Sequence, residues 1–565
     1  MKKKLLILIS LLLVMTMIFV GCVPKTDDEP ADTGEETETP VVDDEDEEDD
    51  DEEVADTGEK ILKTNNASEP GSLDPALATG THESWVLNHT FEGLMKLDED
   101  GMVVEGMAES YELADDDVTY TFKMRDDVKW SNGDPVTAHD FEFAWKRALD
   151  PDLAADYAFQ IYYIKGGEAY NTGEGSLEDV GVKALDDLTL EIVLESPTGY
   201  FLELLAFYTY FPVNKAVVEG NDEWANNADT HVSNGPFSLT EWVHDGSIKI
   251  RKNDNYYDAA SINLDGVDFT IIEEASTTWQ GYEGGEYDFL VDIPQAVTAK
   301  MVAEDNDELK LGAMVGTYYY NLNPDVKPFN NVKVRKALAY TLDRETITSK
   351  ITQGGQIPAE GVVPFGIMDE DGTEYRDKLG KMVEFNLEEG KKLLAEGLEE
   401  EGMTVDDMKG LVLLYNTDEG HKKIAQAAQE MWRQNLGIEI QLENVDFNVK
   451  LDREKSGDYD ISRAGWVGDY VDPMTFIDLW WSQSSFNDVK YNNPDYDAMV
   501  AEAKGTADQA IRFEAMRAAE KMIMEDMAVI PVYFYTQPYA QKPYVTGVYK
   551  PLVNYPKLTY ADIER

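Results

Sequence analysis

Two kinds of hydrophobic spacing alternate along the chain from residue 61 onward. Residues 119–124 (TYTFKM) alternate polar and apolar side chains, which predicts a strand with one buried face. Residues 331–342 and 419–436 place apolar side chains three and four positions apart, which predicts two helices, and Gly437 is expected to end the second. Residues 438–442 alternate again and predict a strand. This mixture, without an internal repeat, predicts an α/β protein of two or three lobes.

A helix with clear boundary signals is predicted near residue 140. Thr137 can cap its first turn, and Asp140 lies where a carboxylate favours the amino end of a helix. Apolar positions continue at helical spacing to Leu149, and the Asp150-Pro151 pair stops the element. The sequence therefore predicts a helix that begins after Thr137 and ends at Leu149.

The start of the chain has the pattern of a secretory signal peptide over residues 1–21. Three lysines precede an apolar run over residues 5–20, and Gly21-Cys22 follows. A cysteine in this place resembles the bacterial lipobox. We therefore expect Cys22 to carry a lipid that anchors the protein on the extracellular face of the cell membrane, or on its periplasmic face in a Gram-negative cell. The alternative is a transmembrane anchor with an incidental cysteine, although the run is short for a span.

The next segment, residues 22–60, is dominated by acidic side chains. It has few large apolar residues and a dense acidic block over residues 43–53, so it cannot bury enough surface to fold. We expect an extended tether behind the lipidated cysteine. The whole chain has 112 acidic and 48 basic residues, a formal charge of −64. Because nucleic-acid binding requires a basic face, this balance excludes nucleic acid as a partner.

No catalytic pattern stands out in the sequence. It lacks a G-x-S-x-G elbow, an H-E-x-x-H pair, a phosphate-binding loop and a Rossmann glycine triplet. Its only cysteine lies in the leader region, and its 6 histidines do not have the spacing of a zinc site. We therefore expect no metal, no other cofactor and no enzyme. An enzyme that acts on cell-wall sugars or peptides stays an alternative, because carboxylates are abundant.

Several segments spread over the chain resemble the bacterial extracellular solute-binding proteins of family 5, the oligopeptide-binding lipoproteins of peptide ABC transporters. The segments are EPGSLDP (69–75), FEGL (91–94), VKWSNGDPVTAHDF (128–141), NGPF (234–237), YYY (318–320), FNNVKVRKAL (329–338), YNT (415–417), HKK (421–423), RAGW (463–466), DY (469–470) and IPVY (530–533). Their order and spread, rather than any one of them, carry the resemblance.

The resemblance implies a three-lobe α/β fold of the periplasmic-binding-protein type, class II, in which two halves close on a hinge over the ligand. Domain I would be discontinuous, made of residues 61–91, 215–315 and 533–565. Domain II would be an insertion over residues 92–214, and domain III would cover residues 316–532.

The resemblance also implies which residues hold a peptide. Asp469 matches the family carboxylate that pairs with the peptide's α-ammonium group, and Trp466 would form a flat apolar wall beside it. Arg463, Arg453 and His421 match positions that meet the peptide carboxylate. Further contacts are implied for Tyr157, Gly465, Tyr470 and Phe447.

Four other positions depart from the best-known members of the family. Acidic residues that border side-chain pockets are replaced by Thr79, Ala275 and Asn321, and a pocket lysine becomes Ile351. Fewer acidic groups predict a weaker preference for peptides that contain Lys or Arg.

The function that the resemblance implies is the capture of short peptides and their delivery to the permease subunits of an ABC importer, by a protein expected to be monomeric. Within the family the alternatives are a dipeptide, a cell-wall peptide, a signalling peptide or a nickel complex. The Trp-x-x-Asp-Tyr pattern at residue 466 and the lack of clustered histidines favour peptides over metal. A purely structural role as a surface lipoprotein is a further alternative function.

Overall fold

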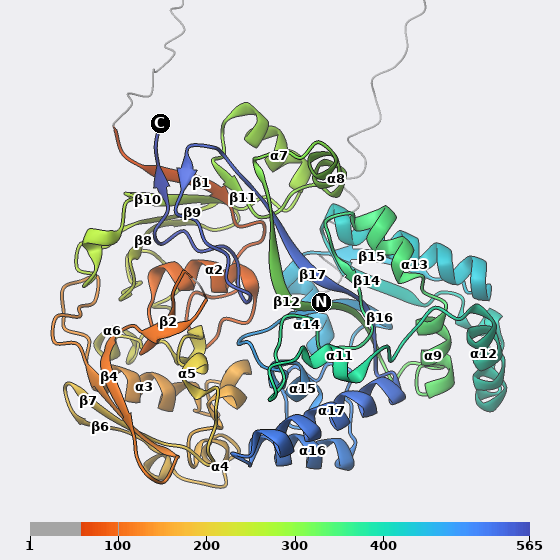
Figure 1. Cartoon of the computed structure of the whole chain (residues 1–565), viewed down its shortest axis with the longest axis horizontal. Helices are drawn as coiled ribbons and strands as arrows, with labels where there is room; N and C mark the ends of the chain where they lie inside the picture. The colour runs from red at the N-terminus through yellow and green to blue at the C-terminus, as the bar shows by residue number, and fades with distance from the viewer. Residues whose placement is uncertain (1–57, 100) are drawn as a thin grey trace, which may run out of the picture. The chain divides into compact units, whose positions relative to one another are not determined.

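The computed structural model describes residues 58–99 and 101–565. The predicted signal peptide, the predicted lipidation site Cys22 and most of the predicted tether lie outside the described residues. The described strands form three main sheets, which are called the first, second and third sheet in chain order (Figure 1).

The first sheet brings together strands that are far apart in the sequence. Its order is β1-β10-β9-β8, with β1 parallel to β10 and the other pairs antiparallel. Its strands are β1 (Ile61–Asn65), β8 (Phe237–Val243), β9 (Ser247–Lys252) and β10 (Gly266–Thr270). Helix α2 (Thr81–Thr90) packs against it, since the ring of the buried Trp85 lies 5.2 Å from that of Phe269.

The second sheet is antiparallel throughout, in the order β4-β5-β7-β6. Its strands are β4 (Ala108–Leu113), β5 (Thr119–Met124), β6 (Val182–Asp186) and β7 (Thr189–Val193). Strand β5 confirms the strand predicted over residues 119–124. Helix α3 (Ala138–Ala148) lies beside β6, and the Thr137 N–H donates to Asp140 Oδ2 at 2.8 Å, which confirms the predicted cap.

The third sheet contains seven strands and supplies one wall of the cavity described below. Its order is β11-β17-β12-β16-β14-β15, with β13 paired to β17. Its strands are β11 (Phe289–Leu290), β12 (Leu309–Leu322), β13 (Ile357–Pro358), β14 (Val412–Asn416), β15 (Gln441–Val445), β16 (Ile461–Val467) and β17 (Val529–Gln541). The long strands β12 and β17 run antiparallel beside each other (Figure 1).

Strand β16 has one edge that is only partly paired. It pairs with β12 from Ile461 to Val467, whereas β14 reaches only to Ser462. Beyond Ser462, β14 continues toward β15 and leaves β16. Within the described part of the chain, the edge of β16 from Arg463 to Val467 is therefore unpaired.

Helices surround the third sheet. The longer ones are α9 (Val332–Tyr340), α12 (Leu387–Glu401), α13 (Glu419–Leu436), α14 (Phe447–Ser456), α16 (Pro494–Lys504) and α17 (Gln509–Asp526). Helices α9 and α13 confirm the two predicted helices, and α13 ends at Gly437, whose φ of 73° is left-handed. The remaining helices are α4 (Gly167–Asn171), α5 (Phe201–Leu204), α6 (Lys215–Val218), α7 (Ala275–Gly284), α8 (Gln295–Ala303), α10 (Arg344–Thr346), α11 (Tyr375–Leu379) and α15 (Met474–Ile477).

The strand predicted over residues 438–442 is displaced along the chain. Ile438 and Ile440 are buried, but the strand in the structure is β15, Gln441–Val445. Its parallel partner β14 begins with Val412 opposite Gln441, so the residues before Gln441 have no neighbouring strand to pair with. Burial alone produced the apolar pattern that the sequence analysis assigned to a strand.

The buried Asp74 joins three distant segments. It is 2% exposed, and its carboxylate accepts hydrogen bonds from the Arg147 guanidinium at 3.1 and 2.6 Å and from the Trp224 indole N–H at 3.3 Å. Removal of one partner from a buried pair costs about 3–5 kcal/mol. This junction therefore holds the segments around residues 74, 147 and 224 together firmly.

The predicted domain boundaries stay a prediction. The second sheet falls within residues 92–214, but β12 and β17 run across the predicted boundaries near residues 316 and 532 without interruption.

Candidate functional site

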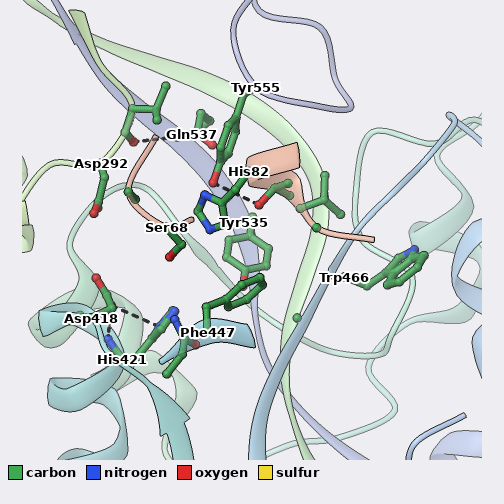
Figure 2. A pocket seen from close by; sticks show the side chains of 18 of the residues that line it. Ser68, His82, Asp292, Asp418, His421, Phe447, Trp466, Tyr535, Gln537 and Tyr555 are labelled. Atoms are coloured by element: carbon green, nitrogen blue, oxygen red, sulfur yellow. Dashed lines mark hydrogen bonds and ion pairs between the residues drawn. The ribbon is translucent and has the colours of Figure 1, made fainter. Parts of the chain in front are cut away.

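A cavity of about 380 Å³ lies beside the unpaired edge of β16. Its wall includes residues 66–68, 79–82, 291–295, 416–421, 463–469 and 535–538. Ligand sites commonly have volumes of about 300–1,000 Å³. Seven residues predicted from the sequence line it: Tyr157, His421, Phe447, Arg463, Gly465, Trp466 and Asp469. Figure 2 shows His421, Phe447 and Tyr535 around this space, with Trp466 farther along the same wall.

Asp469 is a buried carboxylate without a cationic partner. It follows β16 and is 9% exposed. Its Oδ1 accepts from the Tyr157 hydroxyl at 3.2 Å and its Oδ2 from Gln160 Nε2 at 2.9 Å. Within the described residues, no Lys, Arg or His forms an ion pair with it. Burial, helped by the nearby Asp478 carboxylate, holds the pKa of Asp469 well above its usual value.

Aromatic rings surround this carboxylate. Trp466 lies 5.1 Å from Phe486 between ring centroids, and Tyr157 lies 4.8 Å from Phe486. The Trp466 indole N–H donates to Thr475 Oγ1 at 3.1 Å, which fixes the ring, and the Asp469 backbone N–H donates to the same oxygen. An apolar enclosure around one carboxyl group suits a group that is cationic and attached to an apolar body.

Arg463 is the opposite case, a buried guanidinium without an acidic partner. It is 9% exposed and lies over the Tyr318 ring, 4.9 Å from its centroid. It donates to the Tyr535 hydroxyl at 2.9 Å and to Asn416 Oδ1 at 3.3 Å, while its Nε has no partner. No carboxylate among the described residues forms an ion pair with it. It can therefore accept an anionic guest.

Gly465, between these two charges, leaves room for Tyr535. A Cβ at residue 465 would lie only 2.4 Å from the Tyr535 hydroxyl oxygen. The same oxygen accepts the hydrogen bond from Arg463. A side chain at residue 465 would thus displace the partner that orients the guanidinium.

His421 and Phe447 line the cavity from α13 and α14. His421 Nδ1 lies 3.4 Å from Asp418 Oδ1, but burial and the Arg463 charge hold the pKa of His421 well below its usual value, so the ring is neutral. The Phe447 ring meets His82 edge-on, with centroids 5.2 Å apart. His82 was not predicted, and it comes from α2 on the first sheet.

Two predicted contact residues, Arg453 and Tyr470, are not brought to the cavity. Arg453 forms ion pairs with Glu443 and Asp458, both at 3.2 Å, near the outside of α14. Tyr470 is 2% exposed and stacks on Tyr200, with centroids 5.0 Å apart. The side chain next to Asp469 thus packs into the interior instead of facing a guest.

The cavity also contains acidic groups that the sequence analysis did not single out. They are Glu273, Asp292, Asp418, Glu419, Glu454 and Asp488. Asp418 and Glu419 lie just before the predicted His421 and could have been noticed there. Asp292 belongs to no motif, and only the fold brings it near Asp418, more than a hundred positions away.

Residues 102–488 match the family described as bacterial extracellular solute-binding proteins, family 5, middle region. The chain belongs to this family. A relative, the oligopeptide-binding protein OppA of Bacillus subtilis (strain 168), is 40% identical over 501 residues, which cover 87% of this chain and 91% of that protein. The predicted family and the predicted α/β binding-protein fold are confirmed.

Solved structures of family members agree in fold. The substrate-binding domain of an oligopeptide ABC transporter from Bacillus anthracis str. Ames superimposes with a TM-score of 0.85 at 34% identity, covering 90% of this chain and 99% of that one. The family consists of solute-binding proteins, so this chain is a binding protein and not an enzyme.

Two structures of one protein indicate the arrangement of the lobes. The murein tripeptide binding protein MppA of Escherichia coli gives a TM-score of 0.82 at 32% identity, over 89% of this chain and 98% of that one. Its unliganded open form gives only 0.60, over 89% and 97%. Since both MppA structures are 32% identical to this chain, the lower score reflects a different arrangement rather than a more distant sequence. The parts around the present cavity are therefore not placed as in the open form.

Two further observations concern the described residues alone. No helix among residues 58–99 and 101–565 combines the length and the apolar character that a membrane crossing needs. The same residues contain no group of three or more His, Cys, Asp or Glu side chains arranged to hold a metal ion.

Proposed function

We propose that this protein captures short peptides in the cavity by their backbone and both termini, and delivers them to the permease subunits of an ABC importer. One observation carries the proposal. A buried carboxylate without a cation, Asp469, and a buried guanidinium without an anion, Arg463, both line the cavity, Arg463 on the open edge of β16 and Asp469 just beyond its end.

The two charges match the two ends of a peptide. An α-ammonium group at Asp469 would supply the missing cation inside the aromatic enclosure. A carboxylate at Arg463 would receive two N–H groups of one guanidinium. Both interactions would be strong because Asp469 and Arg463 are largely buried, where less water screens their charges.

The edge of β16 provides the contacts that do not depend on side chains. An extended guest can add to this edge as a further strand, since every residue offers the same backbone N–H and C=O groups. Asp469 follows Arg463 by six positions, which corresponds to at most about 20 Å of extended backbone. With about 3.4 Å for each residue, this span holds at most about six residues. The side chains of Asp469 and Arg463 would take up part of it, so the guest would contain about three to five residues.

The relatives support a peptide as the guest. The Bacillus subtilis relative is named an oligopeptide-binding protein, and the Escherichia coli structure is that of a murein tripeptide binding protein. A nickel complex lacks comparable support, because the described residues hold no suitable ligand group.

The three predicted domains would enclose the site. Domain I (residues 61–91, 215–315 and 533–565) and domain II (residues 92–214) would face domain III (residues 316–532) across the cavity, and closure would trap the guest. A lipid on Cys22 would keep the protein at the outer face of the membrane, within reach of its permease.

Calorimetry with defined peptides tests this function. Alanine peptides of two to six residues would be titrated into the protein, together with forms that are acetylated at the amino end or amidated at the carboxyl end. We expect the highest affinity at three to five residues and a loss of at least about 30-fold on blocking either end. Equal affinity for free and doubly blocked peptides, or no binding at all, would reject the proposal.

A further inference from the structure

One corner of the cavity carries acidic groups that recognition of peptide termini does not use. Asp292 lies between β11 and α8, and Asp418 is the residue that caps α13. Figure 2 shows their carboxylates pointing toward each other across the cavity. Glu419 adds a third carboxylate, which accepts a hydrogen bond from the Ser276 hydroxyl at 2.8 Å.

Asp292 has no protein partner. Within the described residues it accepts no hydrogen bond and forms no ion pair, although it is only partly exposed. Burial and the like charges of Asp418, Glu419 and Glu274 raise its pKa to about 8. Burial also raises the pKa of Asp418, against the hydrogen bond from the His421 backbone N–H and the Arg463 charge. Arg463 therefore acts on Asp418, but among the described residues no cation forms an ion pair with Asp292.

A second observation also indicates a missing hydrogen-bond donor. The amide oxygen of Gln295, in the same wall, is buried and has no partner. A Cβ added to Gly420 would lie 2.7 Å from Gln295 Nε2 and 3.0 Å from Asp418 Oδ1, so these two side chains meet over Gly420. Carboxylate oxygens and a free amide oxygen are all acceptors, and a buried acceptor without a donor is costly.

We propose that Asp292, Asp418 and Gln295 form a subsite for the cationic side chain of a Lys or Arg residue in a bound peptide. This inference rests on the proposed function, since the cation would be delivered as part of the peptide. An ammonium or guanidinium group carries several N–H donors and one positive charge. It would give the Asp292 carboxylate and the Gln295 amide oxygen the donors that they lack, and it would add a positive charge beside Asp418.

This subsite reverses the preference expected from the sequence. Thr79 and Ala275 do line the cavity, but Asn321 and Ile351 do not. The acidic groups come from Asp292 and Asp418, which stand at other positions in the wall. A metal ion is the less suitable occupant, because no three His, Cys, Asp or Glu side chains of the described residues are arranged to hold one.

The test uses tripeptides that differ in one side chain. Lys, norleucine and Glu would be placed in turn at each position of an alanine tripeptide and titrated by calorimetry. At one position we expect Lys to bind about 30-fold more tightly than norleucine, and Glu more weakly than both. Asp292→Asn and Asp418→Asn should each remove most of this preference, measured for each variant as the ratio of its affinities for the Lys and norleucine peptides. Asn can still cap α13 at residue 418.

The control variant is Glu283→Gln, which removes one exposed negative charge on α7, outside the cavity. It should leave the preference for Lys unchanged. If tripeptides bind but no position prefers Lys, or if Asp292→Asn keeps the preference, the subsite is rejected while peptide binding stands. If no tripeptide binds to the wild-type protein, the proposed function fails and the subsite fails with it.

Discussion

The Tyr157 hydroxyl donates a hydrogen bond to Asp469 Oδ1 at 3.2 Å, although 312 positions separate the two residues. Gln160 adds a bond from the same short turn, η1 (Asp156–Ile161). The carboxylate proposed to bind the guest's ammonium is therefore also held by a distant segment of the chain. The Asp469 side chain therefore couples peptide binding to the contact between η1 and the segment that follows β16.

Replacement of Asp469 by Asn should separate binding from stability. The amide keeps the shape but cannot neutralise an ammonium group, so peptide affinity should fall about a hundredfold or more. Because burial disfavours the ionised form of Asp469, the free variant should melt no lower than the wild type. Calorimetry and thermal denaturation measure the two effects. An affinity within threefold of wild type would contradict the ammonium role.

A double-mutant cycle can assign the role of Arg463. Amidation of the peptide carboxyl end should cost the wild type about 30-fold in affinity, because the guanidinium would lose its anionic partner. In Arg463→Gln the same amidation should cost almost nothing. Arg463→Lys should recover only part of the loss, since an ammonium group lacks the planar fork. Equal costs in wild type and Arg463→Gln would place the peptide carboxylate elsewhere.

Gly465→Ala should weaken binding through Tyr535. The added methyl would meet the Tyr535 hydroxyl, disturb its bond to Arg463 and lower stability by about 1–3 kcal/mol. Combination with Tyr535→Phe should restore the melting temperature but not the affinity. Gly284→Ala is the matched control, because a Cβ there meets no atom within 4 Å. Full affinity in Gly465→Ala would show that this contact does not position Arg463.

The preference for a Lys peptide should depend on pH. The groups around Asp292 are Asp418, Glu419, Glu274 and the hydroxyl of Tyr555. A cationic side chain needs Asp292 ionised, so its binding would displace a proton below a pH of about 8. The ratio of Lys to norleucine affinities should therefore rise from pH 6 to pH 8 and then level off.

Calorimetry in buffers of different ionisation enthalpy would count the released proton. Comparison with norleucine cancels any pH effect at Asp469, which both peptides share. Asp292→Asn should give a flat ratio. A ratio that stays constant in the wild type, or that falls as the pH rises, would contradict the role of Asp292.

The local elements were predictable where one physical signal dominated. Strand β5 and helix α13 agree with the sequence patterns because their apolar positions face the core and because Asp418 and Gly437 cap the two ends of α13. The strand predicted over residues 438–442 is displaced because buried side chains alternate there before the strand begins. The register of β15 is set by β14, which no local pattern records.

Only the site residues that lie within a sequence motif were predictable. Arg463, Gly465, Trp466 and Asp469 lie together in one short segment, so their shared position in the cavity could be expected. Asp292 could not be found, because its importance comes from the carboxylate that the fold places opposite it. Tyr470 was wrongly predicted for a different reason. It follows the site residue Asp469 in the sequence, but its side chain packs on Tyr200 in the core.

The Asp74 junction determines which segments of the molecule can move relative to one another. Its doubly hydrogen-bonded ion pair with Arg147 is enclosed and would be expensive to separate. The links to Asp469 are two hydrogen bonds from neutral side chains, which are worth far less. Opening of the cavity should therefore begin with the loss of the hydrogen bonds to Asp469. The segments that contain residues 74, 147 and 224 should move together as one rigid unit.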